Sequence, residues 1–262
     1  MTRQFTTRAP AAKASLPVGW TLVDLDTVGS TNDEAKALAL DGAAHGTVVR
    51  ARRQAAGKAR RGRRWESPPG NLYCSTVLRP ACSPAAAGQI AFAVALALAE
   101  AIAGCVPDAP PIRLKWPNDV LVRDRKVAGI LLESALASDG AVDWVVVGTG
   151  VNIASHPCDT DYPATSLAAE GAPDVAPLVL LGAFAAALDH WHRRWLRDGF
   201  QPVGVAWRAK AGGLGGPVTV RLDRETVSGR FEDLDADGAM LLGLAGGGRR
   251  RITAGDVFFG DG

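Results

Sequence analysis

The segment 20–26 alternates apolar and polar residues with the period of two that is typical of a β-strand. Runs rich in β-branched residues, bounded by Asp, Asn, Pro or Gly, predict strands at 20–26, 47–52, 71–78, 112–116, 120–122, 127–136 and 142–147. The last four ranges are separated only by short turn sequences. They therefore predict an antiparallel meander.

Helical patterns interrupt and follow these strands. The Ala- and Leu-rich segment 84–103 is apolar on nearly every side, which predicts a single buried helix packed on a sheet. Leucines and tryptophans on one side predict an amphipathic helix over 175–196. A shorter helix is predicted over 203–210.

A further helix is predicted from Ser30 to Leu40, and its first residues could act in two ways. Thr31 and Glu34 have the spacing of a capping box. Hydroxyl and amide side chains at a helix N-terminus can also bind a polar ligand. On the residues alone, capping is the better-supported role.

The same patterns predict three segments. Residues 1–17 have no periodicity and are interpreted as a flexible tail. Residues 18–211 predict an α+β body, with a mixed, mostly antiparallel sheet and packed helices. The Gly-rich sequence 211–216 indicates a linker. In the last segment, 212–262, a small β-barrel is predicted from short strands at 218–222, 227–234, 239–244, 249–253 and 257–259.

Charge is distributed unevenly. The 262 residues carry a formal net charge of +2, yet residues 50–64 contain eight basic side chains and no acid, so the rest of the chain is net acidic. This distribution disfavours a nucleic-acid-coating surface and favours a local anion site. No apolar run reaches the ~18 residues of a membrane span. The four cysteines form no C-x-x-C, so reduced thiols in the cytoplasm are expected. The histidines show no zinc-binding spacing, so no structural zinc site is expected.

Three segments contain candidate chemistry, and each also has a plainer interpretation. The loop 54–65 combines glycines with arginines that could bind carboxylate or phosphate, or it is a solvated basic loop. Residues 115–119 place a lysine and a carboxylate beside a Pro-fixed turn, or form an ordinary hairpin. Residues 126–133 combine a lysine with a strand glycine that leaves room for a ligand, or form a central strand.

The segment Gly148–Asn152 follows a predicted strand and is otherwise a plain exit into a loop. It lacks the G-x-G-x-x-G pattern and helix start of a Rossmann site. The chain also lacks a G-x-x-x-x-G-K-[ST] sequence, so any ATP site here works without a P-loop.

Taken together and in this order, the segments resemble one family, the biotin–protein ligases, over about residues 19–262. The matching segments are Ser30-Thr31-Asn32, Gln54…Gly57…Arg60-Arg61-Gly62-Arg63…Trp65, Lys115-Trp116-Pro117-Asn118-Asp119, Lys126…Ala128-Gly129-Ile130-Leu131…Glu133 and Gly148-Thr149-Gly150…Asn152. The resemblance implies a class II synthetase-like catalytic domain and an SH3-like C-terminal domain. It implies that biotin and MgATP form biotinoyl-5′-AMP, and that a lysine of a biotin carboxyl carrier domain then takes the biotinoyl group.

The resemblance also implies roles for individual residues. Biotin is expected to be bound by Ser30, Thr31, Asn32, Gln54, Gly57, Lys58, Arg60, Lys126, Gly129, Leu131, Gly148 and Gly150. ATP or the adenylate is expected to be bound by Lys58, Arg60, Arg61, Gly62, Arg63, Trp65, Asn118, Lys126 and Asn152. The expected catalytic cations are Lys126, Lys115 and Arg60, and Asp119 is the expected Mg²⁺-linked carboxylate. No tightly bound organic cofactor is expected.

The basic loop departs from the family sequence G-R-G-R-R-G, because Lys58 and Ala59 replace an arginine and a glycine. Lysine lacks the bidentate fork of arginine, and alanine at 59 is strained if that position needs a positive φ. The loop is therefore predicted to hold the adenylate less tightly. Fewer than 20 residues precede the first predicted strand, so no DNA-binding domain, operator binding or repressor activity is expected.

Two rival functions remain at this point. A lipoate–protein ligase would have a similar catalytic fold, although the sequences at 115–119 and 126–131 favour biotin. The second rival is a nucleic-acid-binding protein that uses the basic loop 50–64 and the small β-domain. The net negative charge of the rest of the chain argues against it. The expected assembly is a monomer or a weak homodimer, with no membrane association.

Overall fold

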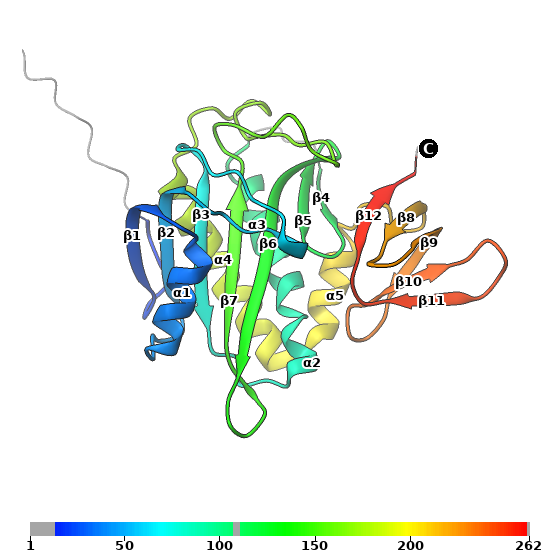
Figure 1. The fold of residues 1–262 in the computed structure, drawn as a ribbon, viewed down its shortest axis with the longest axis horizontal. Helices are drawn as coiled ribbons and strands as arrows, with labels where there is room; N and C mark the ends of the chain where they lie inside the picture. Colours follow the sequence, from blue (N-terminus) through cyan, green and yellow to red (C-terminus); the bar gives the residue numbers. More distant parts are fainter. Residues whose placement is uncertain (1–13, 107–110, 261–262) are drawn as a thin grey trace, which may run out of the picture.

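The computed structural model describes residues 14–106 and 111–260, so the predicted tail at 1–17 lies mostly outside the described residues. A seven-stranded sheet forms the body, in the spatial order β1-β2-β3-β7-β6-β5-β4 (Figure 1). Its strands are β1 (Thr21–Val28), β2 (Thr47–Gln54), β3 (Leu72–Leu78), β4 (Ile112–Lys115), β5 (Asp119–Val122), β6 (Arg125–Leu136) and β7 (Val142–Val151). The α+β class with a mixed, mostly antiparallel sheet is confirmed.

Strand directions follow from the connections between the strands. Helix α1 (Thr31–Leu40) lies between β1 and β2 in the chain and carries it back to the same end, so these two strands pair in parallel. Short turns join β4, β5, β6 and β7, which pair in succession as the predicted antiparallel meander. Strand β3 lies at the centre between β2 and β7 and is buried at every position.

Helices cover both faces of this sheet. Helix α1 packs on one face against β2, β3 and β7, while α3 (Ile90–Ala103) and α4 (Pro177–Asp198) pack together on the other (Figure 1). Helix α5 (Phe200–Arg208) follows directly and packs on both of them. The core therefore lies mainly between the sheet and this second helical layer.

The segment 84–103 differs from prediction in two respects. It forms two helices, α2 (Pro84–Ala87) and α3, with Gly88 and Gln89 between them, where the low helix propensity of glycine favours a break. An 18-residue window of Pro84–Ala103 also has a mean hydropathy of 1.8, so this segment is long and apolar enough to span a membrane, contrary to expectation. Because 72% of that window is buried inside the protein, the segment is accounted for as a core helix.

The C-terminal segment forms a second, five-stranded antiparallel sheet in the order β11-β10-β9-β8-β12. Its strands are β8 (Pro217–Arg221), β9 (Thr226–Leu234), β10 (Met240–Gly243), β11 (Arg249–Ile252) and β12 (Asp256–Phe259). All five predicted strands are present, and the pairings among the described residues leave β11 and β12 as the edges. The indole Nε1 of Trp116 donates to the carbonyl of Gly238 at 3.0 Å, which ties this sheet to the body.

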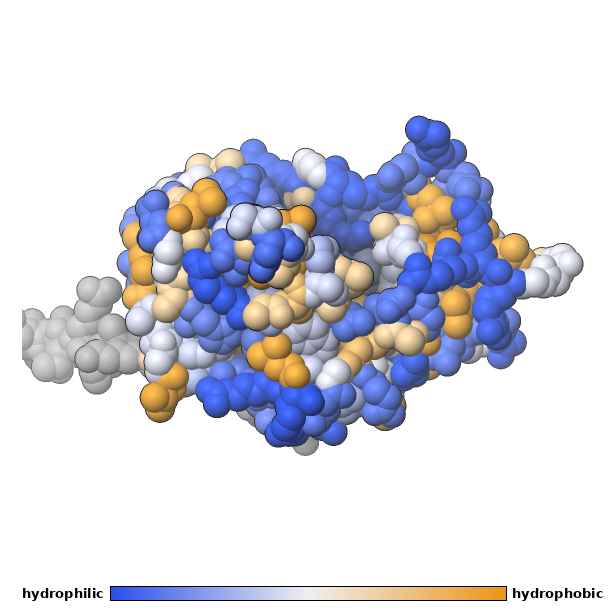
Figure 2. Space-filling view, turned by 90° about the horizontal axis from the view of Figure 1, so that it is seen from below, coloured by the Kyte–Doolittle hydropathy of each residue, from blue (hydrophilic) through white to orange (hydrophobic). Residues whose placement is uncertain are grey.

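The outer surface mixes polar and apolar side chains. On the face seen from below, apolar residues occur in small groups separated by polar ones (Figure 2). Among residues 14–106 and 111–260, six large apolar side chains are exposed, and they are scattered along the chain: Val18, Leu40, Leu136, Val179, Leu196 and Val205. Isolated exposed apolar side chains of this kind are ordinary for a folded protein.

His192 of α4, which is buried, lies against the half-buried His45. The rings of His45 and His192 stack with their centroids 5.1 Å apart. Burial, assisted by repulsion from His45, lowers the pKa of His192 from 6.5 to about 4, with Asp189 only partly opposing this. The folded state therefore keeps His192 neutral where the unfolded chain becomes charged.

Acid should consequently weaken the fold in a defined window. The His192 contribution is fully present above pH 6.5 and is lost as the pH falls towards 4, because only the unfolded state binds the proton across that range. We expect the free energy of unfolding to drop by up to about 3 kcal/mol more in the wild type than in His192→Phe. Urea titrations at pH 6.5 and 4.5 measure this difference, and parallel pH profiles for the two proteins would contradict it.

Candidate active site

A cavity of about 410 Å³ is lined by residues of β6 and β7, of the basic loop 54–65 and of β12 in the small sheet. This volume suits a small organic ligand. The predicted site residues that line it are Ser30, Thr31, Asn32, Gln54, Lys58, Arg60, Arg63, Trp65, Lys115, Asn118, Asp119, Lys126, Gly129, Leu131, Gly148, Gly150 and Asn152. Three predicted residues, Gly57, Arg61 and Gly62, lie in the loop but do not line the cavity.

Four glycines matter because functional side chains occupy the space where a Cβ would lie. At Gly150 a Cβ would lie 2.5 Å from the ring of Trp65, and at Gly129 it would lie 2.9 Å from the same ring. At Gly148 it would overlap the amide of Asn32, and at Gly57 it would overlap the backbone carbonyl of Trp65. The glycines thus seat Trp65 and Asn32 in the wall of the cavity.

Gly148 and Gly150 also correct the interpretation of this segment as an exit into a loop. Strand β7 continues to Val151, and the two glycines pair with Leu131 and Gly129 of β6. Glycine weakens a strand in isolation. Here the ladder on both sides holds it, since Gly148 and Gly150 also pair with Ser75 and Tyr73 of β3.

The predicted capping box at the start of α1 is wrong. Ser30 is the N-cap residue, but its side chain makes no capping hydrogen bond, and the helix begins at Thr31. The Thr31 hydroxyl lies 3.1 Å from Oε1 of Gln54, which also accepts a hydrogen bond of 2.8 Å from the Thr31 backbone N–H. Gln54 on β2 takes over the role of the cap, which leaves Ser30 and Thr31 facing the cavity.

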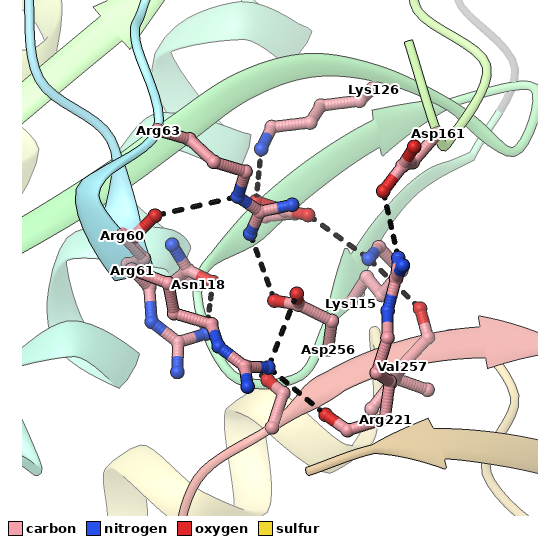
Figure 3. Close-up of polar contacts among 12 residues, drawn as sticks. Arg60, Arg61, Arg63, Lys115, Asn118, Lys126, Asp161, Arg221, Asp256 and Val257 are labelled. Carbon is pink, nitrogen blue, oxygen red and sulfur yellow. Dashed lines mark hydrogen bonds and ion pairs between the residues drawn. The ribbon is translucent and has the colours of Figure 1, made fainter. Parts of the chain in front are cut away.

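Two lysines form ion pairs with one carboxylate in the site. Asp119 Oδ1 lies 2.6 Å from Nζ of Lys126, and Oδ2 lies 3.0 Å from Nζ of Lys115 (Figure 3). Burial raises the pKa of Asp119, but the two ammonium groups outweigh it and hold the pKa at about 2. Asp119 is therefore ionised at neutral pH, and one positive charge remains uncompensated in the group of three.

Lys115 and Lys126 differ in how accessible their ammonium groups are to a ligand. The Lys115 side chain is only 7% exposed, and its ammonium group also donates to the carbonyl of Val257 at 3.1 Å and faces the ring of Tyr162 at 4.3 Å. These contacts make Lys115 a link between Asp119 and β12. The Lys126 side chain is 25% exposed and lies in the cavity 5.3 Å from the ring centroid of Trp65, where it can meet an anion.

The predicted Mg²⁺ role of Asp119 does not fit this arrangement. Both oxygens of Asp119 face ammonium groups, so the carboxylate serves here as the counter-ion of two lysines, whose positive charges disfavour a cation beside it. Within residues 14–106 and 111–260, no three His, Cys, Asp or Glu side chains are grouped so as to hold a metal ion.

The basic loop is joined to the small sheet by its arginines. The carboxylate of Asp256 in β12 forms ion pairs with two loop arginines, at 2.9 Å from Nη2 of Arg63 and 3.5 Å from Nη1 of Arg61 (Figure 3). Arg60 points into the cavity, where its Nη1 donates to Asn118 at 3.0 Å. Burial lowers the pKa of Arg60 from 12.5, with Asp256 and Asp119 opposing the shift. Asp256 thus holds the loop over the cavity from the second sheet.

The loop backbone corrects the expectation about Ala59. Its φ is −126° and ψ is 174°, an extended conformation that any residue adopts, so alanine is unstrained there. The positive φ falls instead on Arg61, at 58°. Lys58 lies at the cavity edge, where its Nζ is 2.5 Å from Oδ1 of Asp33.

Sequence reasoning missed cavity residues from two later parts of the chain. The segment 157–164 contributes Pro157, Asp159, Thr160, Asp161, Tyr162 and Ala164, and β12 contributes Asp256, Val257 and Phe258. An ion pair of 2.8 Å between Asp161 and Arg221 joins the first group to the small sheet. Asp256 follows a Gly-containing turn, yet nothing in its local sequence indicates that β12 folds back onto the loop.

Cations gathered around one cavity, under a basic loop and without a P-loop, define a protein that binds and activates an anionic substrate. The chain belongs to the biotin/lipoate A/B protein ligase family, whose family model matches residues 16–209. The model of the biotin protein ligase C terminal domain matches residues 213–260.

Known proteins agree with this assignment. The chain is 41% identical over 236 residues to the biotin--[acetyl-CoA-carboxylase] ligase of Paracoccus denitrificans, covering 88% of this chain and 97% of that one. The protein of the same name from Mycobacterium tuberculosis is 34% identical, covering 91% and 89%. The structure of the biotin protein ligase of Aquifex aeolicus in complex with biotin and ATP superimposes with a TM-score of 0.79 at 26% identity, covering 91% and 99%.

Proposed function

We propose that this chain is an ATP-dependent biotin–protein ligase, which activates biotin as biotinoyl-5′-AMP and transfers it to a lysine of a biotin carboxyl carrier domain. The observation that carries the proposal is the cavity in which Lys126 and Arg60 face the polar wall formed by Thr31, Asn32 and Gln54. The polar side chains suit a polar head group, and the cations suit anions. The named relatives support the choice of biotin.

Activation requires two anions to meet. The biotin carboxylate attacks the α-phosphorus of ATP, a bond forms between carboxylate oxygen and phosphorus, and pyrophosphate leaves with the electron pair of the broken bond. We assign to Lys126 and Arg60, which both line the cavity, the role of offsetting the charge that accumulates around the α-phosphate. Because Asp119 orients the ammonium group of Lys126 before the ligand arrives, little reorganisation is needed during the reaction.

Transfer needs no covalent enzyme intermediate. The neutral acceptor amine attacks the acyl carbon of the mixed anhydride, a C–N bond forms and the C–O bond to the phosphate breaks. AMP leaves with that electron pair, and the nitrogen loses one proton to solvent to give the amide. The basic loop covers the adenylate meanwhile and excludes water, which would hydrolyse it. We propose that the remaining predicted biotin and adenylate contacts, including Gly129, Leu131 and Asn152, serve this enclosure.

Magnesium enters this proposal as the ion that accompanies the ATP phosphates, which themselves supply oxygen ligands. We propose no tightly bound organic cofactor, no nucleic-acid partner and no membrane association, and a monomer or weak homodimer as the working assembly. Cys74, Cys82, Cys105 and Cys158 are free thiols, which suits a reducing compartment such as the cytoplasm.

A transfer assay tests the proposal. Purified protein, biotin, MgATP and a carboxyl carrier domain should give a biotinylated carrier that avidin detects. A carrier whose acceptor lysine is replaced by arginine should remain unlabelled. Labelling that is absent with biotin and present with lipoate would move the chain to the lipoate branch of its family.

The contact between the loop and Asp256 predicts a change in adenylate retention. Asp256→Asn removes the charge that holds Arg61 and Arg63, so the loop should open more often and release biotinoyl-AMP roughly tenfold faster. Rapid-filtration chase experiments measure that rate. Asp223→Asn is the matched control, because Asp223 also pairs with Arg61 but has an 89% exposed side chain, where ion pairs contribute little. Equal rates in the two variants would refute the proposed role of Asp256.

Lys58 gives a second prediction about the same rate. Arginine at 58 restores a bidentate anion contact, so Lys58→Arg should slow adenylate release several-fold. Since Ala59 is unstrained, adding Ala59→Gly should give no further slowing. The same chase experiment decides, and an unchanged rate in Lys58→Arg would show that the lysine already holds the ligand as well as an arginine.

A further inference from the structure

Lys126, to which we assign charge stabilisation at the α-phosphate, lies at a break in the large sheet. In the ladder between β5 and β6, Lys126 pairs with Leu121 and Ala128 pairs with Val120, so Val127 is an extra residue on β6. The ladder between β6 and β7 begins at Ala128. Such a β-bulge re-aims a side chain, and it also takes the backbone at the bulge out of the regular ladder.

A later segment of the chain supplies the backbone partners of Lys126. Its N–H donates to the carbonyl of Pro163 at 2.7 Å, and its carbonyl accepts from the backbone N–H of Thr165 at 2.9 Å. Lys126 thereby forms a parallel bridge with Ala164, which lines the cavity. These two hydrogen bonds therefore fix both the backbone of Lys126 and the adjoining cavity wall.

Thr165 connects this bridge to a buried carboxylate. Its hydroxyl donates to Oε1 of Glu170 at 2.6 Å, and its carbonyl accepts from the side-chain amide of Asn152 at 3.0 Å. Thr165 has no exposed surface, so water cannot replace a contact that is lost there. The hydroxyl contact with Glu170 is thus part of what holds residue 165 against Lys126.

Glu170 also binds the turn that leads into Lys126. Its side chain is only 1% exposed, and it accepts from Nη2 of Arg125 at 2.6 Å and from Nε of Arg123 at 3.2 Å. Arg123 and Asp124 form the turn between β5 and β6 with φ values of 49° and 56°, a conformation that residues other than glycine rarely adopt. The contacts of Glu170 with both arginines offset the cost of this backbone conformation.

We propose that Glu170 is a positioning residue for Lys126. It does not line the cavity, and it acts through Thr165 and the preceding turn to fix the backbone of Lys126 at the bulge. Asp119 holds the ammonium end of the same side chain, and Glu170 holds its backbone end. A displacement of about 1 Å at a reacting centre can lower a rate about a hundredfold, so both ends matter. The inference rests on the proposed function, because its effect is on the reaction assigned to Lys126.

The test is a double-mutant cycle measured by biotin-dependent ATP–pyrophosphate exchange. Thr165→Val replaces the hydroxyl with a methyl group of similar size and should lower kcat roughly tenfold, as should Glu170→Gln. Thr165→Ser keeps the hydroxyl and should recover most of the activity lost in Thr165→Val. In the Lys126→Ala background neither Thr165→Val nor Glu170→Gln should cause a further loss, because the group that they position is gone.

Glu232→Gln is the matched control, since Glu232 also pairs with an arginine, at 2.6 Å from Arg249, but lies in the small sheet outside the cavity lining. It should keep wild-type exchange. If Glu170→Gln does not fold, the Thr165 variants decide, because the Thr165 hydroxyl reports the same contact.

Three results would overturn this inference alone: full activity in Thr165→Val, an equal loss in Thr165→Ser, or losses that add to that of Lys126→Ala. Additive losses would show that the contact supports the fold without positioning Lys126. A wild type that shows no biotin-dependent exchange would overturn the proposed function, and this inference with it.

Discussion

Lys126→Ala should reduce biotin-dependent ATP–pyrophosphate exchange by on the order of a hundred- to a thousand-fold, the usual effect of removing a group that stabilises charge in the transition state. Lys126 is the partly exposed member of the Lys115–Asp119–Lys126 group and lies in the cavity. Its removal leaves Asp119 paired with Lys115, so the folded structure should persist. Because Lys126 is assigned to stabilising the transition state, the loss of activity should appear mainly in kcat.

The control for Lys126→Ala is Lys210→Ala, which removes an exposed lysine that does not line the cavity. It should keep full exchange activity. Thermal unfolding of both variants checks that the fold is intact. Full activity in Lys126→Ala would remove the central catalytic assignment.

Asp119→Ala should destabilise the protein by about 3–5 kcal/mol, because it leaves the buried ammonium group of Lys115 without its counter-ion. For a chain of this length that corresponds to roughly 10 °C in Tm. The sign of the pH effect agrees: the Asp119 pKa is held at about 2, so its contribution is present above 3.8 and is lost only as the pH falls through 2.

A surface ion pair provides the comparison for Asp119. Asp26→Ala removes the partner of Arg52 at 3.6 Å, where the Asp26 side chain is 83% exposed, and should change stability by well under 1 kcal/mol. Calorimetric unfolding without Mg²⁺ measures both variants. If Asp119 served as a metal ligand instead, metal-free Asp119→Ala would be as stable as the wild type, and Mg²⁺ would raise the Tm of the wild type alone.

The fold could be predicted where local pattern and tertiary context agree. Turns such as Asp124–Arg125 and Ser138–Gly140 separate the meander strands in the sequence, and those strands pair in that order. The pattern was misleading where a partner distant in sequence decides the outcome. Thr31 has capping-box spacing, yet Gln54 from β2 provides the contact that the cap would have made.

The candidate site likewise divides into residues that local motifs indicate and contacts that depend on the folded structure. Short motifs made Lys126 and Asp119 candidates, whereas the glycines of β7 became candidates only through the family resemblance. The motifs could not show that Asp119 is enclosed by two lysines or that Gly150 makes room for Trp65, since these are packing facts. Residues on β12 were missed for a related reason, since their role depends on how the small sheet meets the loop.

The most direct measurement is ATP–pyrophosphate exchange by the wild-type protein with biotin or lipoate as the only acid. The account predicts rapid exchange with biotin and almost none with lipoate, because the hydrogen-bonding wall of Thr31, Asn32 and Gln54 suits a cyclic urea and not a dithiolane. Exchange that depends on lipoate, or that proceeds equally with either acid, would contradict it.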